Sequence, residues 1–187
     1  MGLLIIDNYD SFTFNLVQLV EEAGCMDYRV VLNDRIPEDL QQYDKILISP
    51  GPGLPSDIPH ITELIRNNAA NRSVLGICLG HQCIIAAFGG KLMKLERILH
   101  GEACNIHQCG PAESIFRELP SFFPGGRYHS WVCDPATLPE ELRITALDSE
   151  GHIMAISHRK YDVKGLQFHP ESIMTPHGRL ILMNWLG

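Results

Sequence analysis

Residues 73–82 read Ser-Val-Leu-Gly-Ile-Cys-Leu-Gly-His-Gln, an apolar run that passes directly into a cysteine flanked by glycines. Ser73–Ile77 predicts a buried strand, and the apolar residues Cys83–Phe88 predict a helix that ends at Gly89 and Gly90. The G-x-C-x-G pattern is the cysteine form of the nucleophile elbow, a sharp turn from strand to helix. The sequence therefore predicts a strand–cysteine–helix turn in an α/β protein.

Cys78 is the candidate nucleophile of this turn. Gly76 and Gly80 leave space where the turn crowds the backbone, and the unpaired N–H groups of a helix N-terminus favour a thiolate. The N–H of Leu79 is a candidate oxyanion donor, and Gln82 can line the mouth of the site. A buried, unreactive cysteine is the alternative reading.

Metal binding is the other reading of this segment. The pairs Cys78–His81 and Cys104–His107 have C-x-x-H spacing, but the second half of a structural zinc pattern is missing. We therefore predict that the chain binds no metal.

A cysteine nucleophile needs a base, and His169-Pro170-Glu171 supplies a candidate. In an extended chain, residues i and i+2 point the same way, so the side chains of His169 and Glu171 can lie side by side. A carboxylate next to a histidine fixes its tautomer and stabilises its cation. The hypothesis is a Cys78–His169–Glu171 triad; the alternative is a solvated histidine near a surface glutamate.

A second loop, Ser49-Pro50-Gly51-Pro52-Gly53, follows another predicted strand. Ligands of open α/β sheets bind beyond the carboxyl ends of strands, so this loop and the Cys78 turn are expected at one edge. Gly51 can offer a second N–H to an oxyanion, whereas Pro52 has none. A plain turn is the alternative, and no G-K-[ST] follows that would make a phosphate-binding loop.

The order of elements predicts the fold class. The first 90 residues alternate strands and helices, with room for a short helix near Glu38–Gln42. Later segments look antiparallel or mixed, and Thr175-Pro176 is expected to cap a last helix. These later segments lie near 91–95, 103–107, 127–134, 143–148, 153–158 and 163–168. We predict a single α/β domain over residues 1–187: an open, mostly parallel sheet flanked by helices with an added antiparallel or mixed section.

Composition excludes several classes of protein. The 187 residues carry a net charge of −7, which disfavours binding to a nucleic-acid backbone. The longest purely apolar run, Cys83–Phe88, is far shorter than a membrane span, and the uncharged start resembles no signal peptide. The six cysteines form no C-x-x-C pair, and most of them are expected to be buried free thiols. The expected location is the cytoplasm.

Six motifs in order along nearly the whole chain resemble the class I (triad) glutamine amidotransferases. The Cys78 turn and His169-Pro170-Glu171 mark the broad class. The start at residues 7–13, the His100-Gly101 pair and Glu171-Ser172-Ile173 indicate the branch formed by the small glutaminase subunits of anthranilate synthase and aminodeoxychorismate synthase. The matching stretches are residues 4–13, 48–53, 76–82, 99–101, 127–130 and 167–173.

The resemblance implies a mechanism. Cys78 would attack the side-chain amide of glutamine, His169 would move the protons, and Glu171 would orient His169. The backbone N–H groups of Leu79 and Gly51 would hold the oxyanion. By similarity, the residues that contact glutamine would be Gly51, Pro52, Gly53, Leu79, Gln82, Ser130 and Trp131. The family commonly has leucine where Trp131 stands.

The resemblance also implies a partner. Ammonia would pass to a larger chorismate-binding synthase subunit, which is expected to need Mg²⁺, whereas this chain would need no cofactor. The turn at residues 10–13 and the loop after Pro52 would face that partner. Whether the pathway leads to anthranilate or to aminodeoxychorismate stays open. A stand-alone γ-glutamyl cysteine hydrolase and a non-catalytic subunit are the alternatives.

Overall fold

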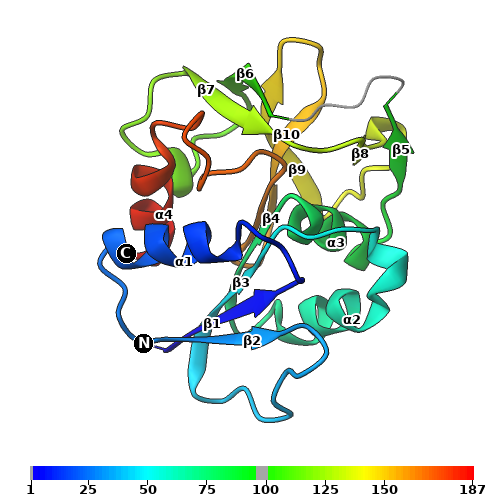
Figure 1. Cartoon of the computed structure of the whole chain (residues 1–187). Helices are drawn as coiled ribbons and strands as arrows, with labels where there is room; N and C mark the ends of the chain where they lie inside the picture. The colour runs from blue at the N-terminus through cyan, green and yellow to red at the C-terminus, as the bar shows by residue number, and fades with distance from the viewer. Residues whose placement is uncertain (1, 96–100) are drawn as a thin grey trace.

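The computed structural model describes residues 2–95 and 101–187, so Leu99 and His100 of one family motif lie outside the described residues. Within this part of the chain, nine strands form one open sheet in the order β2-β1-β3-β4-β11-β10-β9-β6-β7 (Figure 1), and β5 pairs with β8. The strands are β1 (Gly2–Asp7), β2 (Tyr28–Leu32), β3 (Tyr43–Ile48), β4 (Ser73–Ile77), β5 (Leu92–Lys94), β6 (Glu102–Gln108), β7 (Phe122–Arg127), β8 (Trp131–Cys133), β9 (Leu142–Asp148), β10 (Ile153–His158) and β11 (Val163–Leu166).

Two kinds of pairing divide the sheet. Strands β2, β1, β3, β4 and β11 are parallel, and β11, β10, β9, β6 and β7 pair antiparallel. The predicted fold class, a mostly parallel sheet with an added antiparallel section, is confirmed. The last strand of the chain, β11, completes the parallel half beside β4.

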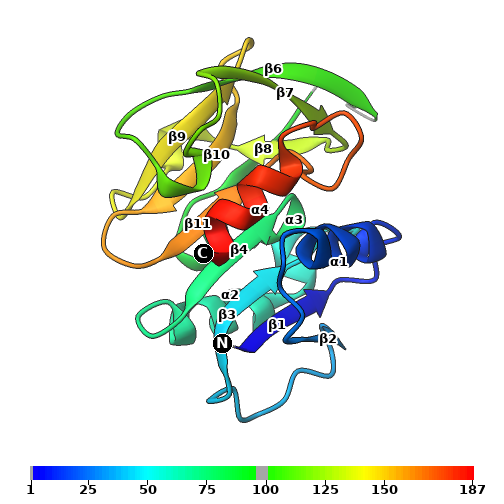
Figure 2. The same cartoon turned by 90° about the vertical axis from the view of Figure 1, so that its left-hand side faces the viewer.

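Helices cover both faces of the parallel half (Figures 1 and 2). Helices α1 (Thr13–Glu22) and α4 (Gly178–Leu186) pack on one face, where Leu16 and Ile181 join a core with Leu3 and Leu75. Helices α2 (Pro59–Asn68) and α3 (Leu79–Ala87) pack on the other. Alternate residues of β1 thus enter opposite cores, as expected of a strand buried on both faces. Short 3₁₀ helices lie at Pro55–Asp57, Ser114–Phe116 and Pro135–Thr137.

Some predicted helix boundaries are wrong. Residues 38–42 form no helix; they contain a bend, two irregular residues and a turn. Helix α4 begins at Gly178 rather than after Thr175, because the hydroxyl of Thr175 donates to the carbonyl of His169 at 2.6 Å. A residue that looks like a helix cap therefore holds the segment that carries His169.

Strand β7 was not predicted, because Pro124, Gly125 and Gly126 interrupt its apolar pattern. It lies at the edge of the sheet, where proline is tolerated. Gly125 leaves room for the buried Ile106 side chain, since a Cβ atom at Gly125 would lie 2.2 Å from Cδ1 of Ile106 and that side chain would have to move. The glycines that looked like turn signals thus allow close approach of neighbouring groups.

The sheet brings four loops to one edge. Asp7, Ile48, Ile77 and Leu166 are the last residues of β1, β3, β4 and β11, which are adjacent and parallel. The segments that follow them begin at Asn8, Ser49, Cys78 and Gln167. All predicted catalytic residues follow these strand ends.

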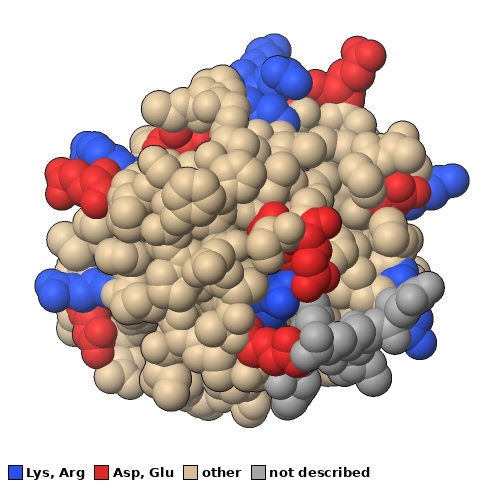
Figure 3. All heavy atoms as spheres, turned by 90° about the horizontal axis from the view of Figure 1, so that it is seen from above, with Lys and Arg blue, Asp and Glu red and all other residues tan. Residues whose placement is uncertain are grey.

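The surface in Figure 3 carries lysine and arginine side chains scattered among acidic ones, with no broad basic patch on that face of the described chain. No helix among the described residues is long and apolar enough to cross a membrane.

Candidate active site

Cys78 occupies the predicted turn between β4 and α3, with φ +50° and ψ −99°. Non-glycine residues rarely adopt this backbone conformation, which aims the side chain outward at a strand-to-helix turn. A Cβ atom on Gly76 would lie 2.4 Å from the backbone of Gly80, and one on Gly80 would lie 2.5 Å from the carbonyl oxygen of Ile48. Both glycines are therefore required for β4, α3 and β3 to approach this closely.

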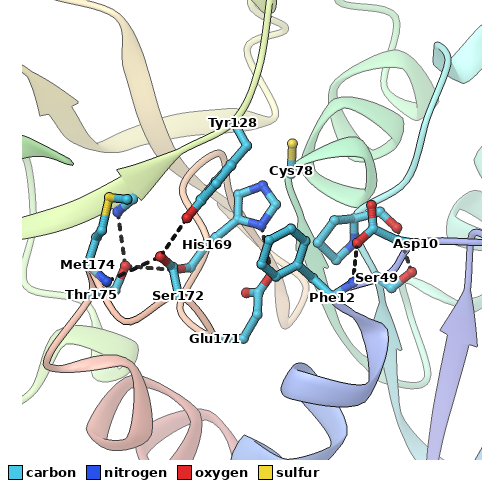
Figure 4. A network of polar contacts seen from close by, with 12 residues as sticks. Asp10, Phe12, Ser49, Cys78, Tyr128, His169, Glu171, Ser172, Met174 and Thr175 are labelled. Atoms are coloured by element: carbon cyan, nitrogen blue, oxygen red, sulfur yellow. Dashed lines mark hydrogen bonds and ion pairs between the residues drawn. The ribbon is translucent and has the colours of Figure 1, made fainter. Parts of the chain in front are cut away.

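The structure brings His169 and Glu171 together at a distance of 2.6 Å between Nδ1 and Oε1. The predicted side-chain alternation of an extended strand is not what brings these two side chains together. A turn brings them together: the Ser172 N–H donates to the carbonyl of His169, and the His169 N–H donates to the carbonyl of Gly126. Because a carboxylate accepts, Nδ1 carries a proton and Nε2 is left for another partner. Figure 4 shows the imidazole between Cys78 and Glu171.

The surroundings of His169 favour its cationic form. Burial lowers its pKa, but the charge and hydrogen bonding of Cys78, followed by those of Glu171, outweigh burial and raise the pKa well above 6.5. A carboxylate on one side and a sulfur on the other are what an imidazolium paired with a thiolate requires.

Neighbouring side chains fix the position of His169. The rings of Tyr128 and Phe12 pack edge-on to the imidazole, at centroid distances of 4.8 and 6.0 Å (Figure 4). The Tyr128 hydroxyl lies 3.0 Å from Oγ of Ser172, and Thr175 Oγ1 joins the Gly126 N–H to the His169 carbonyl. The base is thus held through both its backbone and its ring.

The loop at residues 49–53 lies against the Cys78 turn, as predicted. Asn8 fixes its start: the Asn8 N–H donates to Oγ of Ser49, and Nδ2 donates to the Ser49 carbonyl. A Cβ atom on Gly51 would lie 2.5 Å from Cβ of Asn8 and 3.0 Å from Cδ2 of Leu79. Gly51 and Leu79 are therefore neighbours at the strand edge, as a two-donor oxyanion site requires.

A pocket of about 320 Å³ opens in front of Cys78. Every residue predicted to contact glutamine lines it, together with three that were not predicted. The lining residues are Gly51, Pro52, Gly53, Leu54, Cys78, Leu79, Gln82, Tyr128, His129, Ser130 and Trp131. The position of Tyr128 and His129 directly before Ser130 is the signal that could have identified them.

Two buried histidines flank the site. His81 is fully buried against Gly165, and burial lowers its pKa to about 3. Burial, helped by the charges of Arg127 and His169, lowers the pKa of His129 to about 4. Both imidazoles are therefore neutral at neutral pH.

These histidines make the fold sensitive to acid. Their folded-state pKa values lie below 6.5, so the unfolded chain binds protons first as the pH falls. We expect the free energy of unfolding to fall below pH 6.5 by about 1.4 kcal/mol per pH unit for each histidine. His169, whose pKa is raised, is protonated in both states there and adds no slope. Urea unfolding of the wild type and His129→Gln at several pH values checks this; equal slopes would contradict it.

Among the described residues, no group of three or more His, Cys, Asp or Glu side chains could hold a metal ion. His81 belongs to the Cys78–His81 pair whose spacing suggested a metal site, and its ring is buried beside Gly165.

The model of the class-I glutamine amidotransferase family matches residues 4–186. Component 2 of anthranilate synthase from Methanothermobacter thermautotrophicus is 45% identical, with 98% of this chain and 97% of the relative covered. Aminodeoxychorismate/anthranilate synthase component 2 of Bacillus subtilis is 42% identical, with 98% and 95% covered. Aminodeoxychorismate synthase component 2 of Escherichia coli is also 42% identical, with 98% of each chain covered.

Solved structures share the fold. A Thermoplasma acidophilum protein superposes with a TM-score of 0.87 at 25% identity, with 100% of this chain and 92% of that chain covered. A glutamine amidotransferase from Thermotoga maritima gives a TM-score of 0.76 at 16% identity, with 91% and 76% covered.

Proposed function

Because this chain belongs to the class-I glutamine amidotransferases, we propose that it is the glutaminase subunit of a two-component synthase that aminates chorismate. The supporting observation is that Cys78 lines a pocket together with every residue expected to contact glutamine, while the His169 imidazole, held by Glu171, interacts with Cys78. Relatives that match over nearly their whole length are named as component 2 of anthranilate or aminodeoxychorismate synthases.

In the proposed reaction, the Cys78 thiolate attacks the carboxamide carbon of glutamine. The resulting oxyanion accepts hydrogen bonds from the N–H groups of Leu79 and Gly51. Protonated His169 gives its proton to the leaving nitrogen, so ammonia departs and a glutamyl thioester remains. Neutral His169 then takes a proton from water, which attacks the thioester and releases glutamate and the thiolate. Glu171 keeps His169 in one orientation throughout.

Exposed apolar side chains at the same edge support a partner. Tyr9 is 56% exposed, Phe14 is 76% exposed, and Ile173 is 96% exposed. Tyr9 and Ile173 lie on the loops that follow β1 and Glu171, and Phe14 lies in the first turn of α1, so all three are near the site. We assign this edge to docking of the chorismate-binding subunit, and we place the Mg²⁺ requirement in that subunit. The six free cysteines suit the reducing cytoplasm.

The test is release of ammonia and glutamate from glutamine, by this chain alone and with each candidate synthase subunit. We expect strong stimulation by an anthranilate synthase subunit, an aminodeoxychorismate synthase subunit, or both, which identifies the pathway. Brisk hydrolysis that neither subunit changes would overturn the proposal in favour of a stand-alone γ-glutamyl hydrolase.

A further inference from the structure

Gln167 is a buried polar side chain that the proposed mechanism does not use. It directly follows β11 and is 0% exposed. Its Nε2 lies 3.6 Å from Sγ of Cys78, the distance of an N–H···S hydrogen bond. A buried amide loses free energy unless its groups are paired, so the contacts of both ends are informative.

A backbone carbonyl determines which way this amide points. The carbonyl oxygen of Trp131 can only accept, so the Gln82 atom 3.0 Å from it is the amino group, Nε2. Nε2 of Gln82 also lies 3.3 Å from one end of the Gln167 amide. Because Nε2 donates, that end must accept and is therefore Oε1 of Gln167. The other end of the Gln167 amide, its amino group, is then the one that faces Cys78. The chain of contacts leaves no second arrangement that satisfies each pair.

We propose that Gln167 is a catalytic residue that donates a hydrogen bond to the Cys78 thiolate, and that Gln82 fixes its orientation from the wall of the glutamine pocket. Hydrogen bonds to a charged acceptor are stronger than those to a neutral one, and low polarity around them increases the difference. The Gln167 amino group therefore favours the thiolate over the thiol. Gln167 contacts Cys78 from the end of β11, whereas His169 contacts it from the loop that follows β11.

Hydrogen bonds through Gln82 and Gln167 connect the wall of the glutamine pocket to Cys78. Trp131 and Gln82 line the glutamine pocket, while Gln167 does not. Loss of the Gln167 amide leaves the Gln82–Trp131 bond in place, so the shape of the pocket is retained. We therefore expect Gln167 variants to lower kcat far more than they raise KM.

The experiment measures thiol reactivity without turnover. Wild type, Gln167→Met and Gln167→Glu are treated with iodoacetamide across a range of pH, and alkylation of the Cys78 peptide is followed by mass spectrometry. Methionine keeps the volume without the amide, and a carboxylate accepts instead of donating. We expect alkylation of Cys78 at pH 7 to slow about tenfold in both variants.

Two controls accompany the measurement. Gln18→Met changes an exposed glutamine whose side chain donates a hydrogen bond to Glu22, and it should leave the rate unchanged. Cys25, a partly exposed free thiol on the same molecule, should react equally in all variants. Thermal unfolding verifies that each variant is folded; should Gln167→Met not fold, Gln167→Glu decides the question alone.

Alkylation rates of Cys78 within twofold of wild type in the folded variants would overturn this proposal. The proposal rests on the function proposed above, in which Cys78 is the nucleophile, but its readout does not depend on a partner or on glutamine. Absence of glutamine hydrolysis in every complex would overturn that function. It would not change the alkylation result, which tests the hydrogen bond from Gln167 to Cys78 separately.

Discussion

Replacement of Cys78 by alanine is expected to lower kcat for glutamine hydrolysis by about 10⁴-fold or more, measured in the complex with the stimulating subunit. Alanine removes the atom that bonds to the glutamyl group, so the oxyanion donors and the pocket can only assist attack by water. The turn itself remains, because Gly76 and Gly80 still provide its close contacts.

Cys78→Ser tests the same step with a hydroxyl group in place of the thiol. We expect it to be nearly as inactive, because a serine hydroxyl ionises far less readily beside the same imidazole. Cys25→Ser is the matched control, since Cys25 is also a free cysteine but lies outside the pocket. Glutamine hydrolysis by Cys78→Ala near the wild-type rate would remove Cys78 from the mechanism.

Gly178→Ala is expected to lower kcat by about 100-fold and the free energy of unfolding by about 2 kcal/mol. A Cβ atom on Gly178 would lie 1.8 Å from the carbonyl oxygen of Pro170 and 2.8 Å from its carbon. Helix α4 cannot retreat freely, because Ile181 and Trp185 are buried in the core beneath it. The peptide of Pro170 must move instead, and misplacement of a catalytic group by about 1 Å costs about 100-fold.

The measurement for Gly178→Ala combines steady-state kinetics with urea unfolding. Gly151→Ala is the control: its φ is +86° and no atom lies within 4 Å of the added Cβ, so we expect a loss of about 1 kcal/mol and unchanged kcat. Wild-type kinetics in Gly178→Ala would show that the Pro170 segment can shift without disturbing His169.

The parallel half of the fold could be predicted from sequence because its signals are local. Strand β4 has the predicted bounds, and the Cys78 turn lies where Gly76 and Gly80 indicated. β7 and the function of Thr175 could not be predicted in this way. Pro124 and the adjacent glycines resemble a turn unless the edge position is known, and the Thr175 hydroxyl serves His169 only because β7 lies beside it.

The candidate site shows the same division. Cys78, His169 and Glu171 were predicted from spacing and chemistry, although a turn rather than strand alternation joins the last two. Tyr128 and Gln167 were not predicted as site residues. Each acts through a contact across the fold, Tyr128 with the His169 ring and Gln167 with Sγ of Cys78. Contacts between residues far apart in the sequence leave no periodic pattern, so they could not be predicted from the local sequence.

The most direct test of the central claim is labelling with a thiol-alkylating analogue of glutamine in the presence of the synthase subunit, followed by mass spectrometry of all six cysteine peptides. We predict that Cys78 alone is modified, in step with the loss of glutamine hydrolysis, and that excess glutamine protects it. Burial raises the pKa of Cys83 to about 12 and that of Cys104 to about 11, which keeps both thiols unreactive. Loss of hydrolysis with Cys78 unmodified would contradict the account.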